Sequence, residues 1–349
     1  MGGEEASGVR TLADAVSELN PRSIWLHDNR LTAAAAPVIG LVLSSRPAEQ
    51  IIGRLNLSGN QLGDEGVAAL LGALSYPASG ALLALSLGVN GLSDVSLEAV
   101  SQELTAGGAL SSLTELRMGG NPIGPRGALA LAAAMCSEES AAAARLSTLH
   151  LGHTEIGDEG GAAIAHALSD GGAVEEGMLP APPSEPSALK VLHLAESGLS
   201  DGAARSFATA LSSSRCGLRE LWLGGNPLGP AGCAAIVQSL TWGMSGLQRL
   251  WLDRTLMDDS AAAPLAAVLS SPDSALSEVW IGANDLTDEA AAALATALNA
   301  SASNGKLRKL WMDHTDGLTL DGAKALIQAT EPRAAAPTAT DAIGEGEGE

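Results

Sequence analysis

One short pattern occurs ten times in this chain, and its recurrence limits the possible folds more than any other feature. The pattern is L-x-x-L-x-L-x-x-N-x-L, as in "LTELRMGGNPI" (113–123) and "LRELWLGGNPL" (218–228). Its second apolar position falls at residues 24, 55, 85, 116, 149, 192, 221, 250, 279 and 310. Self-similarity at about 30 residues is typical of a solenoid, in which each repeat buries its apolar face against its neighbours.

Each repeat is expected to contain a strand, a bend and a helix. In "ELW" (220–222) the alternation of a half-buried strand predicts that Leu221 points into the core and Trp222 away from it. The asparagine at the ninth position should satisfy backbone groups at the bend. A helix is expected next, for example at 63–74, where Asp64 can cap the first turn. Helices are wider than the strand spacing of about 4.8 Å, so the stack should curve with its strands on the concave face.

These motifs resemble those of leucine-rich repeat proteins over about residues 20 to 330. The long period resembles the ribonuclease-inhibitor-like subclass, and the chain is also similar to the repeat regions of NOD-like receptors and to Ran GTPase-activating proteins. The resemblance implies an α/β leucine-rich repeat solenoid, a horseshoe with a parallel β-sheet on the concave face and α-helices on the convex face. Because ribonuclease-inhibitor-like repeats bind proteins, it also implies a protein partner.

Three segments depart from the regular repeat. Residues 1–20 are expected to form an N-terminal cap that is partly disordered, and residues 331–349 an acidic, disordered tail. Between them, residues 21–330 form the predicted domain of ten repeats. Within this domain, residues 169–187 lengthen one period and contain four prolines and four acidic residues, which predicts a flexible insertion between a helix and the next strand.

The outward-facing position of the ten strands forms one column across the sheet. In chain order the column contains Trp25, Asn56, Ser86, Arg117, His150, His193, Trp222, Trp251, Trp280 and Trp311. The last four should form a continuous strip of indole surface. Such an apolar strip indicates an interaction site, since tryptophan is enriched at binding hot spots. The other interpretation is that neighbouring indoles stack and stiffen the sheet, and the two roles are compatible.

Charge is divided between the two faces of the predicted solenoid. The strand face carries nine of the 19 basic residues but only seven of the 40 acidic ones, so its charge is about +2 while the rest of the chain carries −23. Tryptophan beside arginine in repeats seven to ten is typical of a surface that binds an acidic and apolar partner. The alternative is that the acids merely cap helices and keep the convex side hydrated. The predicted partner-binding residues are Trp222, Trp251, Trp280, Trp311, Arg219, Arg249, Arg254, Lys309, Glu220 and Glu278.

Composition argues against several classes of partner and location. The net charge of −21 argues against nucleic acid and anionic membranes. The chain lacks a secretory signal and any apolar run of about 18 residues. Its three cysteines are widely spaced without a CxxC motif, which predicts neither a disulfide framework nor a zinc site. We therefore expect a cytoplasmic monomer without a cofactor.

The strongest candidate for metal or catalytic chemistry is a pair of histidine-containing strands. The repeat alignment places His150 beside His193 and His153 beside Glu196. Residues three apart on a strand are separated by about 10 Å, too far for all four to bind one ion, so polar residues on a solvated face are the simpler interpretation. Catalytic motifs such as G-x-S-x-G, the P-loop and HExxH are absent. These observations predict a non-enzymatic protein–protein interaction module, with a GTPase-activating protein of the Ran-GAP-like type as the alternative.

Overall fold

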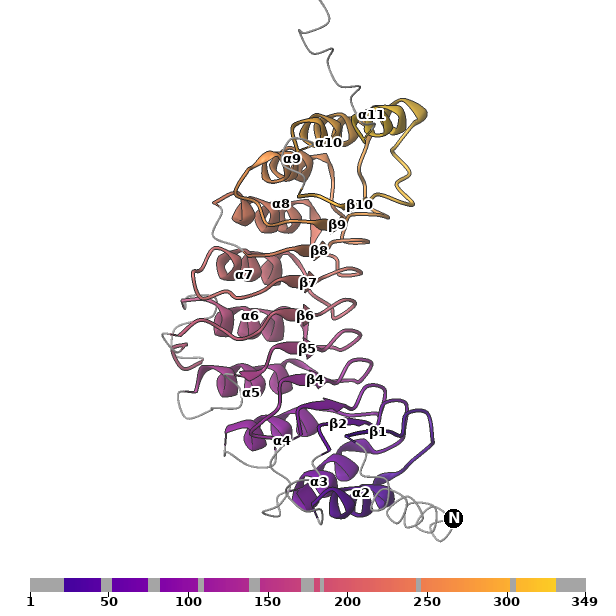
Figure 1. Ribbon diagram of the computed structural model, residues 1–349, viewed down its shortest axis with the longest axis vertical. Coiled ribbons are helices and arrows are strands. Elements are labelled where there is room, and N and C mark those ends of the chain that lie inside the picture. The colour runs from indigo at the N-terminus through magenta and orange to yellow at the C-terminus, as the bar shows by residue number, and fades with distance from the viewer. Residues whose placement is uncertain are drawn as a thin grey trace, which may run out of the picture.

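A short parallel strand begins each of the ten repeats. The computed structural model describes residues 22–44, 52–74, 82–105, 110–137, 145–170, 179–182, 185–242, 246–301 and 306–330. Its strands form one sheet whose order follows the chain. They are β1 (Ser23–Trp25), β2 (Arg54–Asn56), β3 (Ala84–Ser86), β4 (Glu115–Arg117), β5 (Thr148–His150), β6 (Val191–His193), β7 (Glu220–Trp222), β8 (Arg249–Trp251), β9 (Glu278–Trp280) and β10 (Lys309–Trp311). Figure 1 shows these strands along the inner side of an arc, so the predicted α/β solenoid is confirmed.

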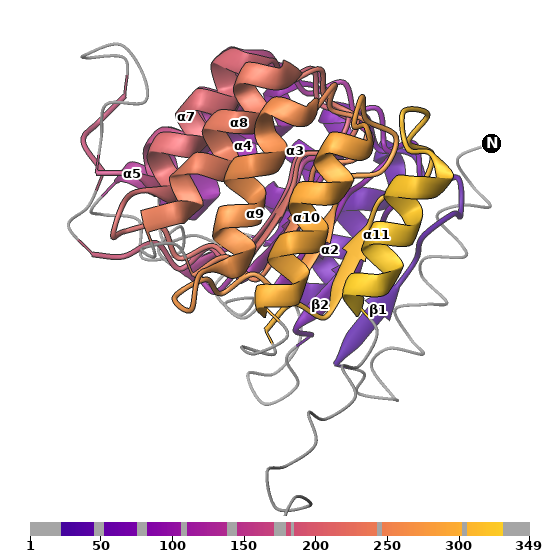
Figure 2. The same ribbon diagram turned by 90° about the horizontal axis from the view of Figure 1, so that it is seen from above.

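The helices form the outer, convex layer. They are α2 (Ala36–Ser44), α3 (Gly63–Leu74), α4 (Asp94–Thr105), α5 (Pro125–Cys136), α6 (Gly157–Leu168), α7 (Asp201–Leu211), α8 (Gly229–Ser239), α9 (Ala262–Ser270), α10 (Asp288–Ser301) and α11 (Leu320–Thr330), with 3-10 turns η1 (Ala33–Ala35), η3 (Leu240–Trp242) and η4 (Asp259–Ala261). Each helix packs against the helix of the next repeat, and Figure 2 shows them side by side. Five of the eight buried residues of α6 are alanine or glycine, which allows this close approach.

The middle residue of each strand points into a continuous aliphatic core. From Leu55 in β2 to Val279 in β9, this residue is at most 1% exposed. The register places equivalent residues side by side, so that Leu221 lies between Leu192 and Leu250. This confirms the predicted inward orientation of Leu221.

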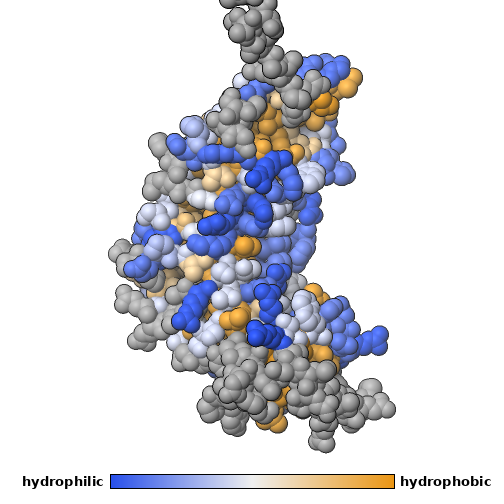
Figure 3. All heavy atoms as spheres, in the orientation of Figure 1, coloured by the Kyte–Doolittle hydropathy of each residue, from blue (hydrophilic) through white to orange (hydrophobic). Residues whose placement is uncertain are grey.

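At the C-terminal end the core is covered less completely. A hollow of about 290 Å³ lies between β10 and the helices α10 and α11, lined in part by Leu307, Leu310 and Leu326. Leu320 and Ile327 of α11 are exposed, and Figure 3 shows hydrophobic surface near this end of the molecule. Helix α11 packs against α10 at this end of the solenoid.

Buried asparagines hold consecutive repeats together at the bends, as predicted. Asn226 is representative: its amide group donates to the carbonyls of Leu194 and Leu223, both at 2.8 Å. Its Oδ1 accepts hydrogen bonds from the backbone N–H groups of Ser197 at 2.8 Å and Leu199 at 3.1 Å. Equivalent bonds are made by Asn60, Asn90, Asn121 and Asn284. Each side chain therefore satisfies at least four backbone groups that would otherwise be buried without partners.

The aspartates at the helix starts cap the neighbouring helix rather than their own. The prediction that Asp64 caps α3 is wrong, because its carboxylate accepts from the N–H of Ser93 at 2.9 Å and the hydroxyl of Ser96 at 2.5 Å, at the start of α4. Asp288 likewise accepts from the N–H of Thr319 at 2.8 Å, just before α11. The close helix spacing brings the first turn of one repeat within reach of the next, so a single carboxylate links two helices.

The described parts of the insertion at 169–187 are attached to the solenoid. Arg215, which is 7% exposed, donates from Nη1 to the carbonyl of Ser169 at 2.6 Å and from Nε to the carbonyl of Glu185 at 3.1 Å. His166 Nε2 lies 3.1 Å from the carbonyl oxygen of Pro180. Residues 171–178 and 183–184 of the insertion, the predicted cap at 1–20 and the predicted tail at 331–349 lie outside the described residues.

Candidate functional site

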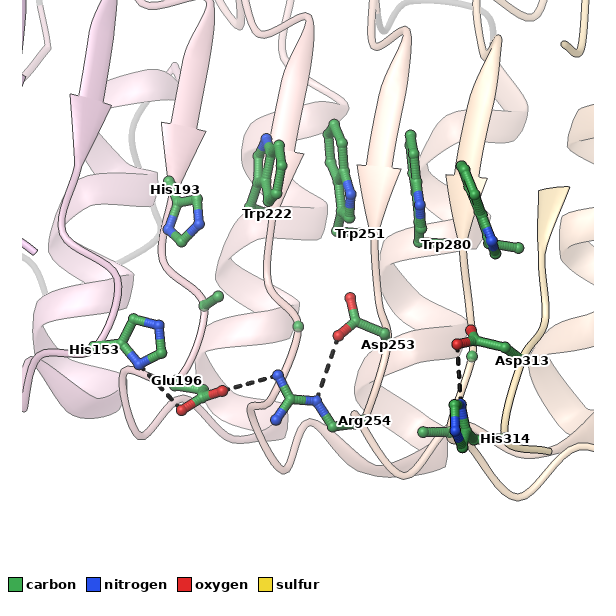
Figure 4. A pocket seen from close by; sticks show the side chains of 15 residues that line it. His153, His193, Glu196, Trp222, Trp251, Asp253, Arg254, Trp280, Asp313 and His314 are labelled. Atoms are coloured by element: carbon green, nitrogen blue, oxygen red, sulfur yellow. Dashed lines mark hydrogen bonds and ion pairs between the residues drawn. The ribbon is translucent and has the colours of Figure 1, made fainter. Parts of the chain in front are cut away.

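Six aromatic rings stack in one row on the concave face. The strand register pairs the members of the predicted column, and their rings lie nearly parallel, with interplanar angles of 12° to 28°. From His150 through His193, Trp222, Trp251 and Trp280 to Trp311, the successive centroid distances are 3.8, 5.0, 3.6, 4.3 and 5.3 Å. Figure 4 shows the side chains of His193, Trp222, Trp251 and Trp280 one after another along the row. We call this row the aromatic ladder.

Stacking changes what the tryptophans present to solvent. Because each inner ring has a neighbour on both faces, the ladder exposes ring edges rather than the broad indole surface that the sequence predicts. Trp251, in the middle of the four indoles, is only 9% exposed, whereas Trp311 at the end is 46% exposed. Trp25, in the same column but outside the ladder, is 63% exposed. The ladder therefore stiffens the sheet, and Trp311 offers a partner the most surface.

The two histidines belong to this ladder, so their interpretation as polar residues on a solvated face is wrong. Burial, and then the proximity of His193 and Arg117, lowers the pKa of His150 to about 4. Burial, and then the proximity of His153, lowers the pKa of His193 to about 4. Both rings are thus neutral at pH 7 and stack like the indoles that follow them.

Four of the predicted charged residues form a second ladder beside the aromatic one. They lie at the first position of β7 to β10, two residues before each tryptophan and on the same face. Arg249 Nη1 lies 2.5 Å from Glu220 Oε1, and Arg249 Nε lies 3.5 Å from Glu278 Oε1. Lys309 Nζ lies 3.3 Å from Glu278 Oε2 and is placed 5.9 Å from the centroid of the Trp311 ring. This ion-pair ladder is neutral as a whole.

The remaining two predicted arginines lie elsewhere. Arg219 is exposed immediately before β7, on the opposite side of the ion-pair ladder from the tryptophans. Arg254 lies in the loop after β8, where it bonds Glu196 Oε1 at 2.8 Å and approaches Asp253 Oδ2 at 3.5 Å. The hydrogen bond from Arg254 holds the pKa of Glu196 below its usual value, and the same bond raises the pKa of Arg254. His153 adds a further contact to Glu196, with Nδ1 3.1 Å from Oε2.

A groove of about 740 Å³ lies between the aromatic ladder and the loops that follow the strands. Ring edges from His193 to Trp311 form one side, and Figure 4 shows the charged loop residues opposite them. The loop side consists of His153, Glu196, Asp253, Arg254, Asp313 and His314. Small residues keep the space between open: Ala195, Gly224, Gly282 and Ala283.

The predicted partner-binding residues do not include the acidic residues of this groove, although Glu196 belongs to the predicted pair of histidine-containing strands. Asp253 and Asp313 come two residues after a ladder tryptophan, so the same alternation that places the tryptophans on this face also places the aspartates there. Glu196 follows one position later in its repeat. The sequence signal for these acidic residues is therefore their position, two or three residues after the outward-facing residue of a strand.

Residues of the groove loops adopt left-handed backbone conformations. His153, Glu196, Arg254 and His314 have φ values of 57°, 52°, 54° and 53°. The equivalent position in three other repeats is glycine, for example Gly225 with φ 70°. The bend thus requires this conformation, and it turns the side chain of the loop residue toward the groove.

Other chemistry is sparse in the part of the chain that the structure describes. Its histidine, cysteine and acidic residues form no group of three that could hold a metal ion. Three cysteines are free and buried: Cys136, Cys216 and Cys233. Among the described helices, none is both long enough and apolar enough to cross a membrane.

A comparison with protein-family models agrees with the repeat architecture. A family model described as "Leucine Rich repeat" matches residues 54–71, 109–132 and 146–165. Among solved structures, an internalin from Listeria monocytogenes is similar over 93% of this chain and 92% of its own, with 13% identity and a TM-score of 0.41. No curated protein sequence matches the chain. With its ten-stranded parallel sheet, asparagine-linked bends and three matched segments, the chain has the fold of a leucine-rich repeat solenoid.

Proposed function

We propose that this protein is a non-enzymatic interaction module of the ribonuclease-inhibitor-like subclass, which binds a protein partner on the concave face of repeats seven to ten. The observation that carries the proposal is the groove beside the aromatic ladder. It combines ring edges with six polar or charged loop side chains on one rigid surface. Aromatic residues and arginine are the side chains that most often dominate binding energy at protein interfaces.

The face is rigid before any partner binds. Ring stacking and the ion pairs of Arg249 and Lys309 fix side chains that would otherwise lose rotamer freedom on association. A preorganised surface loses less conformational entropy when it binds. Strands and packed rings therefore provide the scaffold, while Trp311 and the loop residues supply accessible contacts.

The proposal is tested by affinity capture from lysate of the source cells with two single variants. Trp311→Ser removes the most exposed ring of the ladder, and Trp25→Ser removes an even more exposed tryptophan of the same column at the opposite end. We expect a specific partner to be lost with Trp311→Ser and kept with Trp25→Ser. Circular dichroism and thermal unfolding of both variants verify that the fold persists.

Two results would contradict the proposal. If the variant Trp311→Ser captures the same partners as the wild type, the concave face of the C-terminal repeats is excluded as the binding surface. A captured small GTPase whose GTP hydrolysis is accelerated by the wild-type protein would instead support the Ran-GAP-like alternative.

A further inference from the structure

The length of the groove corresponds to a short extended peptide. Its ring edges, from His193 to Trp311, come from the strands of repeats six to ten, and its loop residues come from repeats five to ten. Four strand spacings of about 4.8 Å give a length of about 19 Å. An extended chain advances about 3.3 Å per residue, so about six residues span this distance. A volume of about 740 Å³ is also within the range of pockets that enclose a ligand.

The charges that line the groove are predominantly negative. Three carboxylates, those of Glu196, Asp253 and Asp313, face a single guanidinium, that of Arg254. This guanidinium already bonds Glu196 and approaches Asp253, so little of its charge remains for a ligand. On the other side of the tryptophans, the ion-pair ladder contains two acids and two bases and contributes no net charge.

Two glycines give the aspartates their positions. A Cβ atom at Gly282 would lie 2.1 Å from Asp313 Oδ1, and one at Gly224 would lie 2.5 Å from Asp253 Oδ1. Each carboxylate therefore rests against the glycine of the preceding repeat, in space that any side chain would fill. Asp313 is 61% exposed in its side chain and Asp253 33%, so both remain accessible to a ligand in the groove.

From this arrangement we infer that the groove binds an extended, basic segment of the protein partner. The inference rests on the proposed function and specifies the chemistry of the partner. Apolar side chains of the segment contact the ring edges of the aromatic ladder, while lysine or arginine side chains on the alternate positions reach Asp253 and Asp313. An extended segment presents alternate side chains to opposite sides, which matches a groove with one aromatic and one acidic side. The expected charge is opposite to the acidic partner predicted from sequence, because Arg249, Arg254 and Lys309 are already paired.

The inference is tested by calorimetric titration of the full chain with two blocked six-residue peptides. One alternates leucine with lysine, and its match alternates leucine with glutamate. We expect the lysine peptide to bind, its affinity to fall with added salt, and the glutamate peptide not to bind. The double variant Asp253→Asn/Asp313→Asn keeps the shape of both side chains and should lower the affinity for the lysine peptide by about tenfold.

A matched control separates local contacts from the overall charge of the protein. The double variant Glu65→Gln/Glu289→Gln removes the same two charges from exposed positions in the first turns of α3 and α10. We expect this control to bind the lysine peptide like the wild type. Equal losses in the two double variants would overturn the inference, because they would reflect only long-range attraction.

Three other results would also overturn it: tighter binding of the glutamate peptide, absence of binding for both peptides, or equal affinity for N-acetyl-lysine methylamide and for the lysine peptide. The last would indicate a site for small amines rather than for an extended segment. The capture experiment with Trp311→Ser remains independent of these outcomes. A partner lost in that experiment, together with a failure of the lysine peptide, would retain the proposed function and reject only the basic segment.

Discussion

Removal of one indole from the middle of the aromatic ladder should destabilise the protein far more than removal of an exposed indole from the same column. Trp251 is 9% exposed and lies between Trp222 and Trp280, with centroid distances of 3.6 and 4.3 Å. Replacing a buried tryptophan with alanine costs about 3–5 kcal/mol. Two lost ring pairs, each contributing about 0.5–1.5 kcal/mol beyond buried area, place Trp251→Ala toward the upper part of that range.

Trp25 is the matched control for this prediction. It is 63% exposed and has one edge-on ring neighbour, His27 at 6.2 Å, so Trp25→Ala should cost less than about 1 kcal/mol. Urea unfolding followed by far-ultraviolet circular dichroism gives both free energies of unfolding. The wild type and Trp25→Ala should also show the exciton signal of coupled indoles, and Trp251→Ala should lose most of it. Equal destabilisation by the two variants would refute the stacked ladder.

Three further predictions concern the bends, the histidines and the cysteines. Asn226→Ala leaves four buried backbone groups without partners and should lower the free energy of unfolding by about 4 kcal/mol, whereas the exposed Asn29→Ala should cost less than about 1 kcal/mol. Because the pKa values of His150 and His193 are lowered to about 4, unfolding binds protons that the folded protein excludes. Stability should therefore fall as the pH drops from about 6.5 to about 4, and urea midpoints at pH 7 and pH 5 should differ less in His150→Gln/His193→Gln. Burial raises the thiol pKa values of Cys136 and Cys233 to about 11 and that of Cys216 above its usual value, so a thiol reagent should label the folded protein far more slowly than the urea-unfolded one.

The repeat pattern alone predicts the strands and their register. Inward and outward residues alternate along each strand, and equivalent strands recur about every thirty residues, so only one alignment of the strands satisfies both patterns. It placed Leu221 in the core and Trp222 in the concave column without any knowledge of coordinates. It could not show whether the indoles present faces or edges, because this depends on side-chain rotamers that neighbouring rings fix together. The same limit applies to Arg249, which the sequence predicts as a partner-binding residue although its guanidinium lies between Glu220 and Glu278.

The sequence indicates contacts between repeats less directly than contacts within one repeat. Asp64 has the position of an ordinary N-terminal cap in its own helix, and only the spacing of adjacent helices directs it to Ser93 and Ser96. Burial raises the pKa of the Asp64 carboxyl, but the hydrogen bonds from these two serines outweigh burial and lower it below its usual value. His150 and His193 were aligned correctly, but their stacking follows from the closeness of two rings on adjacent strands.

The left-handed bend after each strand is common to all ten repeats, and the residue placed at it differs between the groove loops and the others. A left-handed conformation costs a residue with a side chain about 1–2 kcal/mol, and glycine avoids this cost. Repeats two, four and seven have glycine at this position, so the fold itself accepts glycine there. The other seven repeats place a side chain there, including Asp28 and Val89 in loops outside the groove and Glu196, Arg254 and His314 in loops that line it. The contacts between Glu196 and Arg254 are largely exposed, and exposed ion pairs contribute only about 0–1 kcal/mol, which does not offset the strain of two such residues. The left-handed strain is therefore a property of the repeat rather than of the groove, and the polar side chains of Glu196, Arg254 and His314 are what distinguish the groove loops from that of Val89.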